Sequence, residues 1–558
     1  MSDAPVRPGR RTAPLHAVAI VLVTVVTYAG SLDGAFVSDD VARVRDNPLV
    51  ASLSAANVRG MFTTFDDSNY IPIKVLSLAI DRQLFGPEPT GFHVTNVALH
   101  AGCALLVYAI LLRLGLVPLA ACLTALAWAV HPLQVESVAW ISERKNVLSG
   151  LFFFAAFLAY LSHSARPRAG AYAAYLGLYL LALLTKMNTM VLPAICLAYE
   201  ALLRRRLDRR HLLVQAPPLA LAALVGWINL HGNTMHGQAW WGGGPVVTWL
   251  TSTVVLFRYL RRVVLPVGLE PLYDVPLHGS PLDPPVLLAL VGIAALGGVT
   301  LWAMRRRPRE AFWLLWFGIT LAPMLNVAVP FRSLMNDRYM YLALLGPLAL
   351  TAFVVADLPS LRRPATAAAC TAIAACAWLS VRQVEVWSNT VSLWTASAVR
   401  RPLIGGDPVY RRTDYEQRVA AVEQALAVRP QSGALHNNLG ELYYESGRLP
   451  EALGELETAN RLTPDEPTIV LNLGRAYLVA GRTADAETAL VRATALSPYQ
   501  FMNHLYLARL HLFGDHDAAK ARAALDAGLR VQPDAAPALG REREALARLE
   551  AASRPPAH

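Results

Sequence analysis

Long apolar stretches alternate with short polar ones over the first 383 residues of the chain. A helix needs about 20 mostly apolar residues to cross the hydrocarbon core of a bilayer. The stretches that approach this length are residues 14–32, 94–112, 116–130, 147–163, 170–185, 188–203, 212–230, 285–304, 311–329, 339–357 and 365–383. The pattern predicts an all-α, polytopic integral membrane domain with about eleven spans.

Clusters of arginine lie on one side of these predicted spans. "RPGRR" precedes the first span and indicates a cytoplasmic N-terminus, and the span reads as a retained anchor because no small-residue cleavage site follows it. Alternation then makes "ARPRAG", "LLRRRLDRRH", "MRRRPRE" and "LRRP" cytoplasmic. The opposite side receives residues 33–92, 131–146, 231–247 and 330–338. This scheme treats 248–264, with arginines in its last turns, as an interfacial amphipathic helix, and it places the C-terminus outside.

After Trp394 the chain becomes amphipathic and repeats with a period of 34 residues. Leu439, Gly440, Tyr443, Ala452, Ala459 and Pro464 recur as Leu473, Gly474, Tyr477, Ala486, Ala493 and Pro498. A third unit covers 502–533 with one extra residue, and a half-repeat ends at Pro430. The period and the small residues are typical of tetratricopeptide repeats, which form an α-solenoid and offer surfaces to partner proteins.

The composition is typical of a membrane protein, and it excludes some classes of function. Hydrophobic residues make up 54% of the chain and charged residues 16%, against about 25% charged in a soluble protein. The net charge of +10 reflects the arginine clusters, so it indicates topology and no nucleic-acid partner. The five cysteines lie in apolar stretches, which excludes a disulfide framework. A soluble α/β domain with a Gly-rich turn, as a nucleotide-sugar enzyme needs, is absent from the pattern.

These patterns divide the chain into five parts. The predicted parts are a cytoplasmic tail (1–13), a membrane domain (14–383) with an outer loop (33–92), a connector (384–411), the repeats (412–540) and a C-terminal tail (541–558).

Polar and ionisable residues collect on the predicted outer side of the membrane domain. An ionisable group at the centre of a membrane helix costs about 2.5–3.5 kcal/mol on insertion scales, so such residues need an explanation. They are Asp39, Asp40, His93, Asn96, His100, His131, Glu136, Glu143, Arg144, Lys145, Lys186, Arg332, Asp337 and Arg338. Carboxylates and cations from different helices on one face predict a site for an anionic substrate.

Each of these residues also has a structural interpretation. His93, Asn96 and His100 share one helix face and can bond a neighbouring helix. Arg144, Lys145 and Lys186 can extend to the membrane interface as ordinary cations do. The aspartate pair can cap the helix of the following loop. The convergence of so many groups on one side favours the site over these alternatives.

Several stretches of the chain resemble a known family. They are "FVSDDVARVRDNPLV", "GFHVTNVALH", "HPLQVESVAWISERKNVLSGLFFFAAFLAYL", "LPVGLEPLYD", "DRYMYLAL" and "VWSNTVSLW". In this order they resemble the transmembrane and tetratricopeptide-repeat protein O-mannosyltransferases and their bacterial relatives, members of the GT-C class that uses polyprenyl-phosphate sugars. The resemblance runs from the first span to Pro533. It departs at Ile71-Pro72 and Met187, so it leaves the sugar unassigned.

The resemblance implies a membrane glycosyltransferase with Asp39 or Asp40 as the base. Arg144, Lys186 and Arg338, with Arg332 and Lys145, would hold the donor phosphate, while His131 and Glu136 would shape the sugar site. His93, Asn96, His100 and Asp337 would support them, and a divalent cation (Mg or Mn), if one is used, would sit at Asp39 and Asp40.

The partners implied are a lipid-linked donor in the bilayer and a protein or glycan acceptor presented by the repeats. The composition suggests a bacterial inner membrane, with the repeats in the periplasm. The alternative is a non-catalytic membrane-anchored scaffold whose repeats recruit envelope-assembly proteins.

Overall fold

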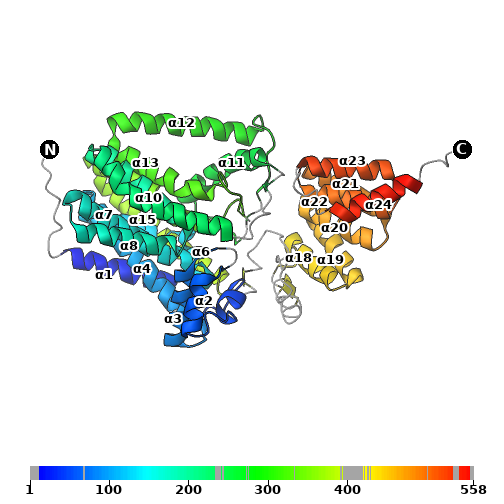
Figure 1. The fold of residues 1–558 in the computed structure, drawn as a ribbon, viewed down its shortest axis with the longest axis horizontal. Helices are drawn as coiled ribbons and strands as arrows, with labels where there is room; N and C mark the ends of the chain where they lie inside the picture. The colour runs from blue at the N-terminus through cyan, green and yellow to red at the C-terminus, as the bar shows by residue number, and fades with distance from the viewer. Residues whose placement is uncertain are drawn as a thin grey trace.

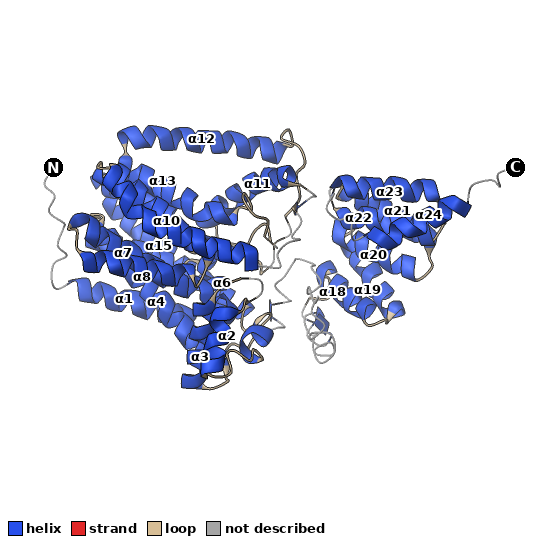
Figure 2. Ribbon diagram, in the orientation of Figure 1, coloured by secondary structure: helices blue, strands red, loops and turns tan. Residues whose placement is uncertain are grey.

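The computed structural model describes most of the chain from residue 12 to residue 552. The parts outside the description are 1–11, 67–68, 233–239, 242–243, 272, 274, 332, 390–391, 394–418, 420–421, 424–425, 428, 499, 532–538 and 553–558. Most of the predicted connector (384–411) and the predicted start of the repeats therefore lie outside the described residues. Helices and loops make up the described parts, with no strand among them (Figure 2). The predicted all-α class is confirmed.

Within the described residues, six helical segments are long and apolar enough to cross a membrane, and each matches a predicted span. They contain α1 (Thr12–Tyr28), α4 (Pro89–Arg113), α7 (Arg144–Ala165), α10 (Arg209–Gly232), α12 (Pro284–Arg306) and α15 (Arg362–Val386). Figure 1 shows them running in similar directions in the larger part of the molecule. A bent pair, α5 (Pro118–Ala129) with the segment Pro132–Ala139, would add a seventh span.

The other predicted spans form shorter or broken helices. They are α5, α8 (Ala169–Leu183), α9 (Leu192–Ala198) between two irregular turns, α13 (Pro308–Leu321) and α14 (Leu345–Ala356). Proline accounts for part of this difference, since it removes a helical hydrogen bond and favours a helix start. Pro132 follows the end of α5, and Pro193 opens α9. The eleven expected spans are therefore six full-length helices and five shorter ones.

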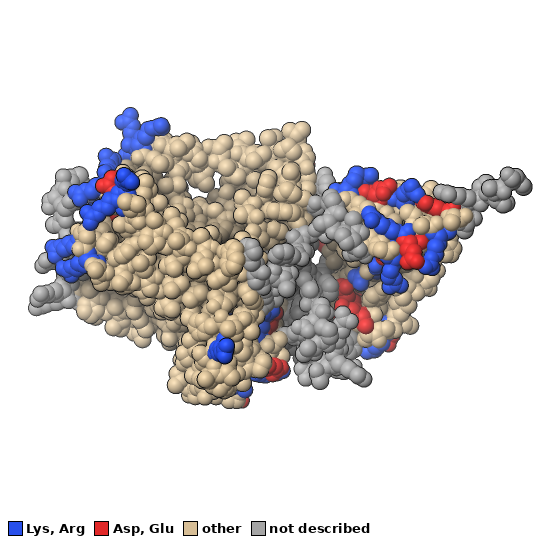
Figure 3. All heavy atoms as spheres, viewed as in Figure 1, with Lys and Arg blue, Asp and Glu red and all other residues tan. Residues whose placement is uncertain are grey.

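The segment predicted to lie at the interface is α11 (Pro245–Val264). It is not among the helices that are long and apolar enough to span, and its place at the interface stays a prediction. One face buries Thr251, Val255 and Tyr259, while Val264 at its end is exposed. Lys and Arg side chains gather at the end of the membrane part where α1 begins and α12 ends (Figure 3).

Short elements connect these helices. At the end opposite the arginine clusters they are η1 (Ala29–Asp33), η2 (Val41–Arg45), α2 (Ala55–Thr63), α3 (Pro72–Phe85), η3 (Pro132–Gln134), α6 (Val135–Ala139), η4 (Ile141–Glu143), η5 (Met187–Val191), η8 (Ala322–Met324) and η9 (Asp337–Met340). The turns η6 (Tyr199–Arg204) and η10 (Pro359–Leu361) belong to the arginine-rich stretches. Aromatic rings fill the interior between the long helices. Trp128 packs against Phe154 and Tyr341, and Phe154 stacks on Trp316.

The C-terminal part is a stack of paired antiparallel helices (Figure 1). They are α18 (Gly433–Glu445), α19 (Leu449–Leu462), α20 (Pro467–Val479), α21 (Thr483–Leu496), α22 (Phe501–Phe513), α23 (Ala518–Val531) and α24 (Gly540–Ala552). A Cβ at Gly440 would lie 2.7 Å from Leu456, and one at Gly474 would lie 2.8 Å from Leu490. Gly447 and Gly481 turn each pair with φ of 80° and 73°. The 34-residue repeat is confirmed as a helical repeat.

Candidate functional site

Asp40 ties the outer loop to the turn that precedes α7. Its carboxylate is fully buried and accepts hydrogen bonds from the backbone N–H of Val37 (3.1 Å) and of Ser142 (2.7 Å). Burial raises the pKa of Asp40 to about 7, although both hydrogen bonds favour the charged form. Asp40 therefore has a structural role, but not the predicted one, because its side chain makes no cap hydrogen bond to the following turn and bonds Val37 and Ser142 instead.

Asp39 points the other way. Its side chain is 49% exposed, and its Oδ2 accepts from Arg43 Nε at 3.2 Å. The backbone makes this possible because Ser38 adopts a φ of 52° and a π-helical turn, η2, follows the pair. Such turns recur at functional sites. Two adjacent aspartates are thus separated into an inner anchor and an outward carboxylate.

Arg43, Asp66 and Lys74 complete this part of the site, although the sequence analysis singled out none of them. Asp66 accepts from Arg43 Nη1 at 3.1 Å and from Lys74 Nζ at 2.6 Å. Burial raises the pKa of Asp66, but the charges of Lys74, Arg43 and Lys145 outweigh it and lower that pKa to about 2. The sequence signal that could have identified Lys74 is its position as a charged residue within the apolar run "IPIKVLSLAI".

A second group of charges surrounds Glu143 at the start of α7. Its carboxylate, only 1% exposed, lies 2.9 Å from Lys145 Nζ and accepts from Asn146 Nδ2 at 2.7 Å. Lys145 also links the two groups, because its charge acts on Asp66. The structure therefore brings the predicted Lys145 and Glu143 together with the charges of the outer loop.

Arg338, on η9, joins this group from a distant part of the sequence. Its Nε lies 3.5 Å from Glu143 Oε1, and its side chain forms an ion pair with Glu136, which also accepts from the Arg338 backbone N–H at 2.7 Å. The guanidinium lies 5.3 Å from the ring centroid of Trp140, which stacks on Trp387 at 5.1 Å. Glu136 therefore positions Arg338.

Lys186 follows α8 and completes the set of cations. Its ammonium donates to Asn146 Oδ1, and within the described residues no carboxylate lies at ion-pair distance from it. Burial lowers the pKa of Lys186 to about 7, with Lys145 and Arg338 acting in the same direction and Glu143 opposing them. The outer loop packs beside this lysine, since Ile73 N–H donates to Leu184 O at 3.4 Å.

Arg144 lies elsewhere than predicted. Its fully buried guanidinium bonds to Asp81 (2.6 Å), Ser77 Oγ (2.8 Å), Phe92 O (2.8 Å) and Asn96 Oδ1. These partners belong to α3 and α4, and none of them is part of the Glu143 group. Arg144 therefore fastens three helices together, which corrects the expectation that its charge faces the donor.

Two of the predicted histidines, His100 and His131, and Asn96 bond neighbouring segments. His100 lies 2.9 Å from both Tyr341 Oη and Ala129 O, and Asn96 Nδ2 donates to Val138 O at 3.1 Å. His131 lies 3.1 Å from Val263 O and accepts from the Leu133 N–H at 3.3 Å. His93 is buried beside the outer loop, where a Cβ on Gly34 would lie 3.0 Å from its Nε2.

The remaining predicted residues are Asp337 and Arg332. Asp337 accepts from Tyr273 Oη at 2.8 Å, and Arg262 lies over the Tyr273 ring at 4.2 Å. Burial raises the pKa of Asp337, and the charge of Glu136 adds to this effect. Asp337 thus anchors the segment that carries Arg338. Arg332 lies outside the described residues.

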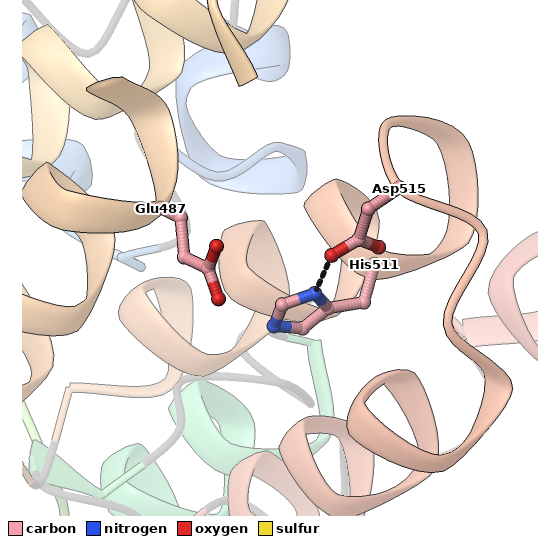
Figure 4. A group of neighbouring side chains, drawn as sticks. All are labelled: Glu487, His511 and Asp515. Carbon is pink, nitrogen blue, oxygen red and sulfur yellow. Dashed lines mark hydrogen bonds and ion pairs between the residues drawn. The ribbon is translucent and has the colours of Figure 1, made fainter. Parts of the chain in front are cut away.

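One group of side chains in the described part of the chain has the composition of a metal site, and it lies in the repeats (Figure 4). Glu487, His511 and Asp515 offer ligand atoms within 4.8 Å of one another. His511 Nδ1 already bonds to Asp515 Oδ2 at 2.8 Å, and Lys520 Nζ pairs with Glu487 at 3.0 Å. Asp39 and Asp40 are not part of such a group, so a metal at this pair stays a prediction.

Comparisons with known proteins find a repeat family and several similar proteins. The tetratricopeptide repeat family matches residues 409–467 and 440–501. Protein O-mannosyl-transferase TMTC4 of Homo sapiens is 34% identical over 163 residues, which cover 25% of this chain and 22% of that protein. Protein O-mannosyl-transferase TMTC1 of Homo sapiens is 34% identical over 169 residues, covering 28% and 19%. Tmtc3 of Drosophila melanogaster is 27% identical over 245 residues, covering 37% and 26%.

Among solved structures, ArnT from Cupriavidus metallidurans bound to undecaprenyl phosphate aligns with a TM-score of 0.39 and 15% identity, over 86% of this chain and 80% of that chain. The GT-C arrangement of the helices stays a prediction at this level of likeness. The chain spans about a quarter or less of the length of the curated relatives it matches. Over the matched segments it is similar to protein O-mannosyl-transferases, in agreement with the sequence resemblance.

Proposed function

We propose that the chain is an integral membrane glycosyltransferase that moves a sugar from a polyprenyl-phosphate donor to a hydroxyl acceptor. The observation that carries the proposal is an outward carboxylate, Asp39, on an outer loop whose Asp66 feels the charge of Lys145, one of three grouped cations with Lys186 and Arg338. Among these cations Lys186 has no carboxylate at ion-pair distance in the described residues. The similarity to protein O-mannosyl-transferases supports the same reaction class.

The chemistry needs both kinds of group. The acceptor oxygen attacks the anomeric carbon, the bond from that carbon to the phosphate oxygen breaks, and the electron pair leaves with the lipid phosphate. The hydroxyl proton passes to a carboxylate, which acts as general base. Preorganised cations stabilise the negative charge that develops on the phosphate.

Asp39 is the better candidate for the base. Asp40 is fully buried and both of its oxygens accept backbone N–H groups, so it has no access to a substrate hydroxyl. Asp39 is half exposed and belongs to the same turn. Asp40 then acts by fixing this turn against Ser142.

Lys186, Lys145 and Arg338 are the candidates for the donor phosphate. They come from the end of α8, the start of α7 and η9, so a bound phosphate would join three separate segments. Glu143 and Glu136 hold Lys145 and Arg338 in place, while the Lys186 ammonium stays available to a substrate oxygen.

The position of the site suggests the side on which it works. The site lies beyond the end of α1, before α7 and after α8, which is the end opposite the arginine-rich turns (Figure 3). The positive-inside rule assigns those turns to the cytoplasm. The site then faces the periplasm of a bacterial inner membrane, where the repeats would present a protein or glycan acceptor.

The experiment uses the full-length protein in detergent, radiolabelled polyprenyl-phosphate mannose and two acceptors, a Ser/Thr-rich peptide and an envelope glycan. We expect Asp39→Asn to lower kcat by about 10²–10⁴-fold, the usual contribution of a general base. Lys186→Met should raise the KM for the donor about tenfold, and Lys520→Met in the repeats is the matched control.

Two outcomes would overturn the proposal. Transfer that is unaffected by Asp39→Asn removes the proposed base. The absence of transfer with every donor and acceptor tried, together with an unchanged cellular phenotype for Asp39→Asn and Lys186→Met, would favour the scaffold alternative.

A further inference from the structure

The outward aspartate is the exposed end of a row of four alternating charges. Asp39 meets Arg43 Nε at 3.2 Å, Arg43 Nη1 meets Asp66 at 3.1 Å, and Asp66 meets Lys74 Nζ at 2.6 Å. We call these four residues the charge row. Exposure decreases along it, from 49% for the Asp39 side chain to 11% for Asp66 and 2% for Lys74.

Two further charged groups act on the charge row. Asp40 is the neighbour of Asp39 in the turn, and the charge of Asp39 acts on it. Lys145 acts on Asp66 from the start of α7. The row itself contains two carboxylates and two cations, so its own charges cancel.

Arg43 has two opposite effects on Asp39, and Asp66 bears on both of them. A guanidinium 3.2 Å from a carboxylate fixes its orientation but also favours its charged form, which makes it a weaker base. A second carboxylate on the far side of the guanidinium offsets part of that effect and leaves the orientation unchanged, although Lys74 pairs with this carboxylate in turn. We propose that Asp66 is a positioning residue that holds Arg43 against Asp39 and offsets part of the Arg43 charge. The proposal rests on the proposed function, in which Asp39 is the base.

Asp66 itself does not suit the role of base. Its two oxygens are occupied by Arg43 and Lys74, and these cations keep its pKa near 2, far from the pH at which a base is efficient. A purely structural role for the Asp66–Lys74 pair is the alternative. The two roles differ in one measurable property, because only a positioning role changes the proton affinity of Asp39.

The test replaces both members of the buried pair. Asp66→Asn alone would leave the Lys74 ammonium buried without its partner, which is strongly destabilising. The double variant Asp66→Asn/Lys74→Gln removes both charges. Asp46→Asn is the matched control, because it breaks the exposed Arg45–Asp46 pair (2.9 Å) of the same loop.

The first readout does not depend on transfer. A hydrophobic carbodiimide modifies protonated carboxyls, so the pH midpoint of Asp39 labelling, followed by mass spectrometry in the full-length protein, reports its proton affinity. We expect this midpoint to fall by about 0.3 pH unit in the double variant, because the negative charge lost at Asp66 lies one step nearer to Asp39 in the charge row than the positive charge lost at Lys74. It should not move in Asp46→Asn. An unchanged midpoint in a folded double variant overturns the proposal.

The second readout is the pH profile of transfer. The acidic limb of kcat should move to lower pH in the double variant, and kcat should fall about ten- to hundredfold with little change in the donor KM, because the base is misplaced. If Asp39→Asn abolishes transfer but the acidic limb of kcat does not move in the double variant, the role proposed for Asp66 is wrong and the proposed function stands. If Asp39→Asn is fully active, the proposed function fails first.

Discussion

Arg144 in the membrane part and Arg482 in the repeats each bond to an aspartate, but in different surroundings. Arg144 is fully buried and meets Asp81 at 2.6 Å, and three further acceptors surround its guanidinium. Arg482 is 46% exposed and meets Asp485 at 2.7 Å. The N···O distances of the two pairs are nearly the same, so the pairs differ in burial and in the number of acceptors around each arginine.

The Arg144–Asp81 pair joins one particular set of helices, whereas a pair like Arg482–Asp485 recurs from repeat to repeat. Arg448 meets Glu451 at 3.0 Å one repeat before Arg482, and each arginine also lies 4.3 Å from the ring centroid of a tyrosine, Tyr443 or Tyr477. A repeat can therefore lose one such pair and keep its neighbours. Four predictions test this difference, in order of decreasing effect.

Arg144→Met should lower the free energy of unfolding by about 3–5 kcal/mol, because it leaves the Asp81 carboxylate buried without its partner. The change is measured by thermal unfolding in detergent, with Arg144→Met/Asp81→Leu as the companion variant. The double variant should recover most of the loss. Equal destabilisation by both variants would mean that packing, and not the unpaired charge, is responsible.

Gly440→Ala should destabilise the first complete repeat by about 1–3 kcal/mol, because the new Cβ would lie 2.7 Å from Leu456 and 3.1 Å from the Ala452 carbonyl oxygen. Hydrogen exchange over α18 and α19 measures the local effect. Gly454→Ala is the control, since open space surrounds that position and helix propensity favours alanine there. A neutral result at Gly440 would show that the helix pair can separate at little cost.

Asp40 should make stability depend on pH. Its pKa of about 7 in the folded protein exceeds the usual 3.8, so the folded state keeps a proton that the unfolded chain releases. Stability therefore falls as pH rises from about 4 to about 7, by at most about 1.4 kcal/mol per pH unit. Melting temperatures at pH 5 and pH 8 should differ more for the parent protein than for Asp40→Asn. Parallel pH curves would contradict the assignment.

Arg482→Ala should have the smallest effect, about 0–1 kcal/mol, because its ion pairs are exposed to solvent. The melting temperature in low and in high salt measures it, and the small loss should shrink further in high salt. A loss of unfolding free energy as large as that of Arg144→Met would contradict the expected difference between the two regions.

The repeats and the long helices could be predicted because their signals are periodic or long. The match of Leu439 and Gly440 to Leu473 and Gly474 at an offset of 34 fixes the helix pairs, and length alone identifies helices such as α4 and α12. The broken helices carried a weaker signal, since proline marks an interruption but does not give its geometry.

The site was predicted in part. Asp39, Glu143, Lys145, Lys186 and Arg338 carry charge on the predicted outer side, and the structure groups the last four. Arg144 and Lys145 are neighbours at the start of α7, and a rotation of about 100° per residue sends them to different partners, which composition cannot reveal.

Asp66 and Lys74 were missed for a related reason. Their pairing brings together two segments of the outer loop, one before and one within α3, and it becomes visible only once the loop is folded. The direction of Asp40 likewise depends on the left-handed backbone at Ser38, for which the sequence carries no strong signal.

The hydrogen bond from the Ile73 N–H to the Leu184 carbonyl has a thermodynamic consequence. It connects the segment that carries Lys74 to the one that carries Lys186, so it joins the acceptor side of the proposed site to the donor side. A ligand that displaces one of these segments then changes the affinity of the other side for its own ligand, and reciprocity requires the same factor in both directions. Donor and acceptor would then bind cooperatively, with the sign set by whether the first arrival draws the two segments together or apart.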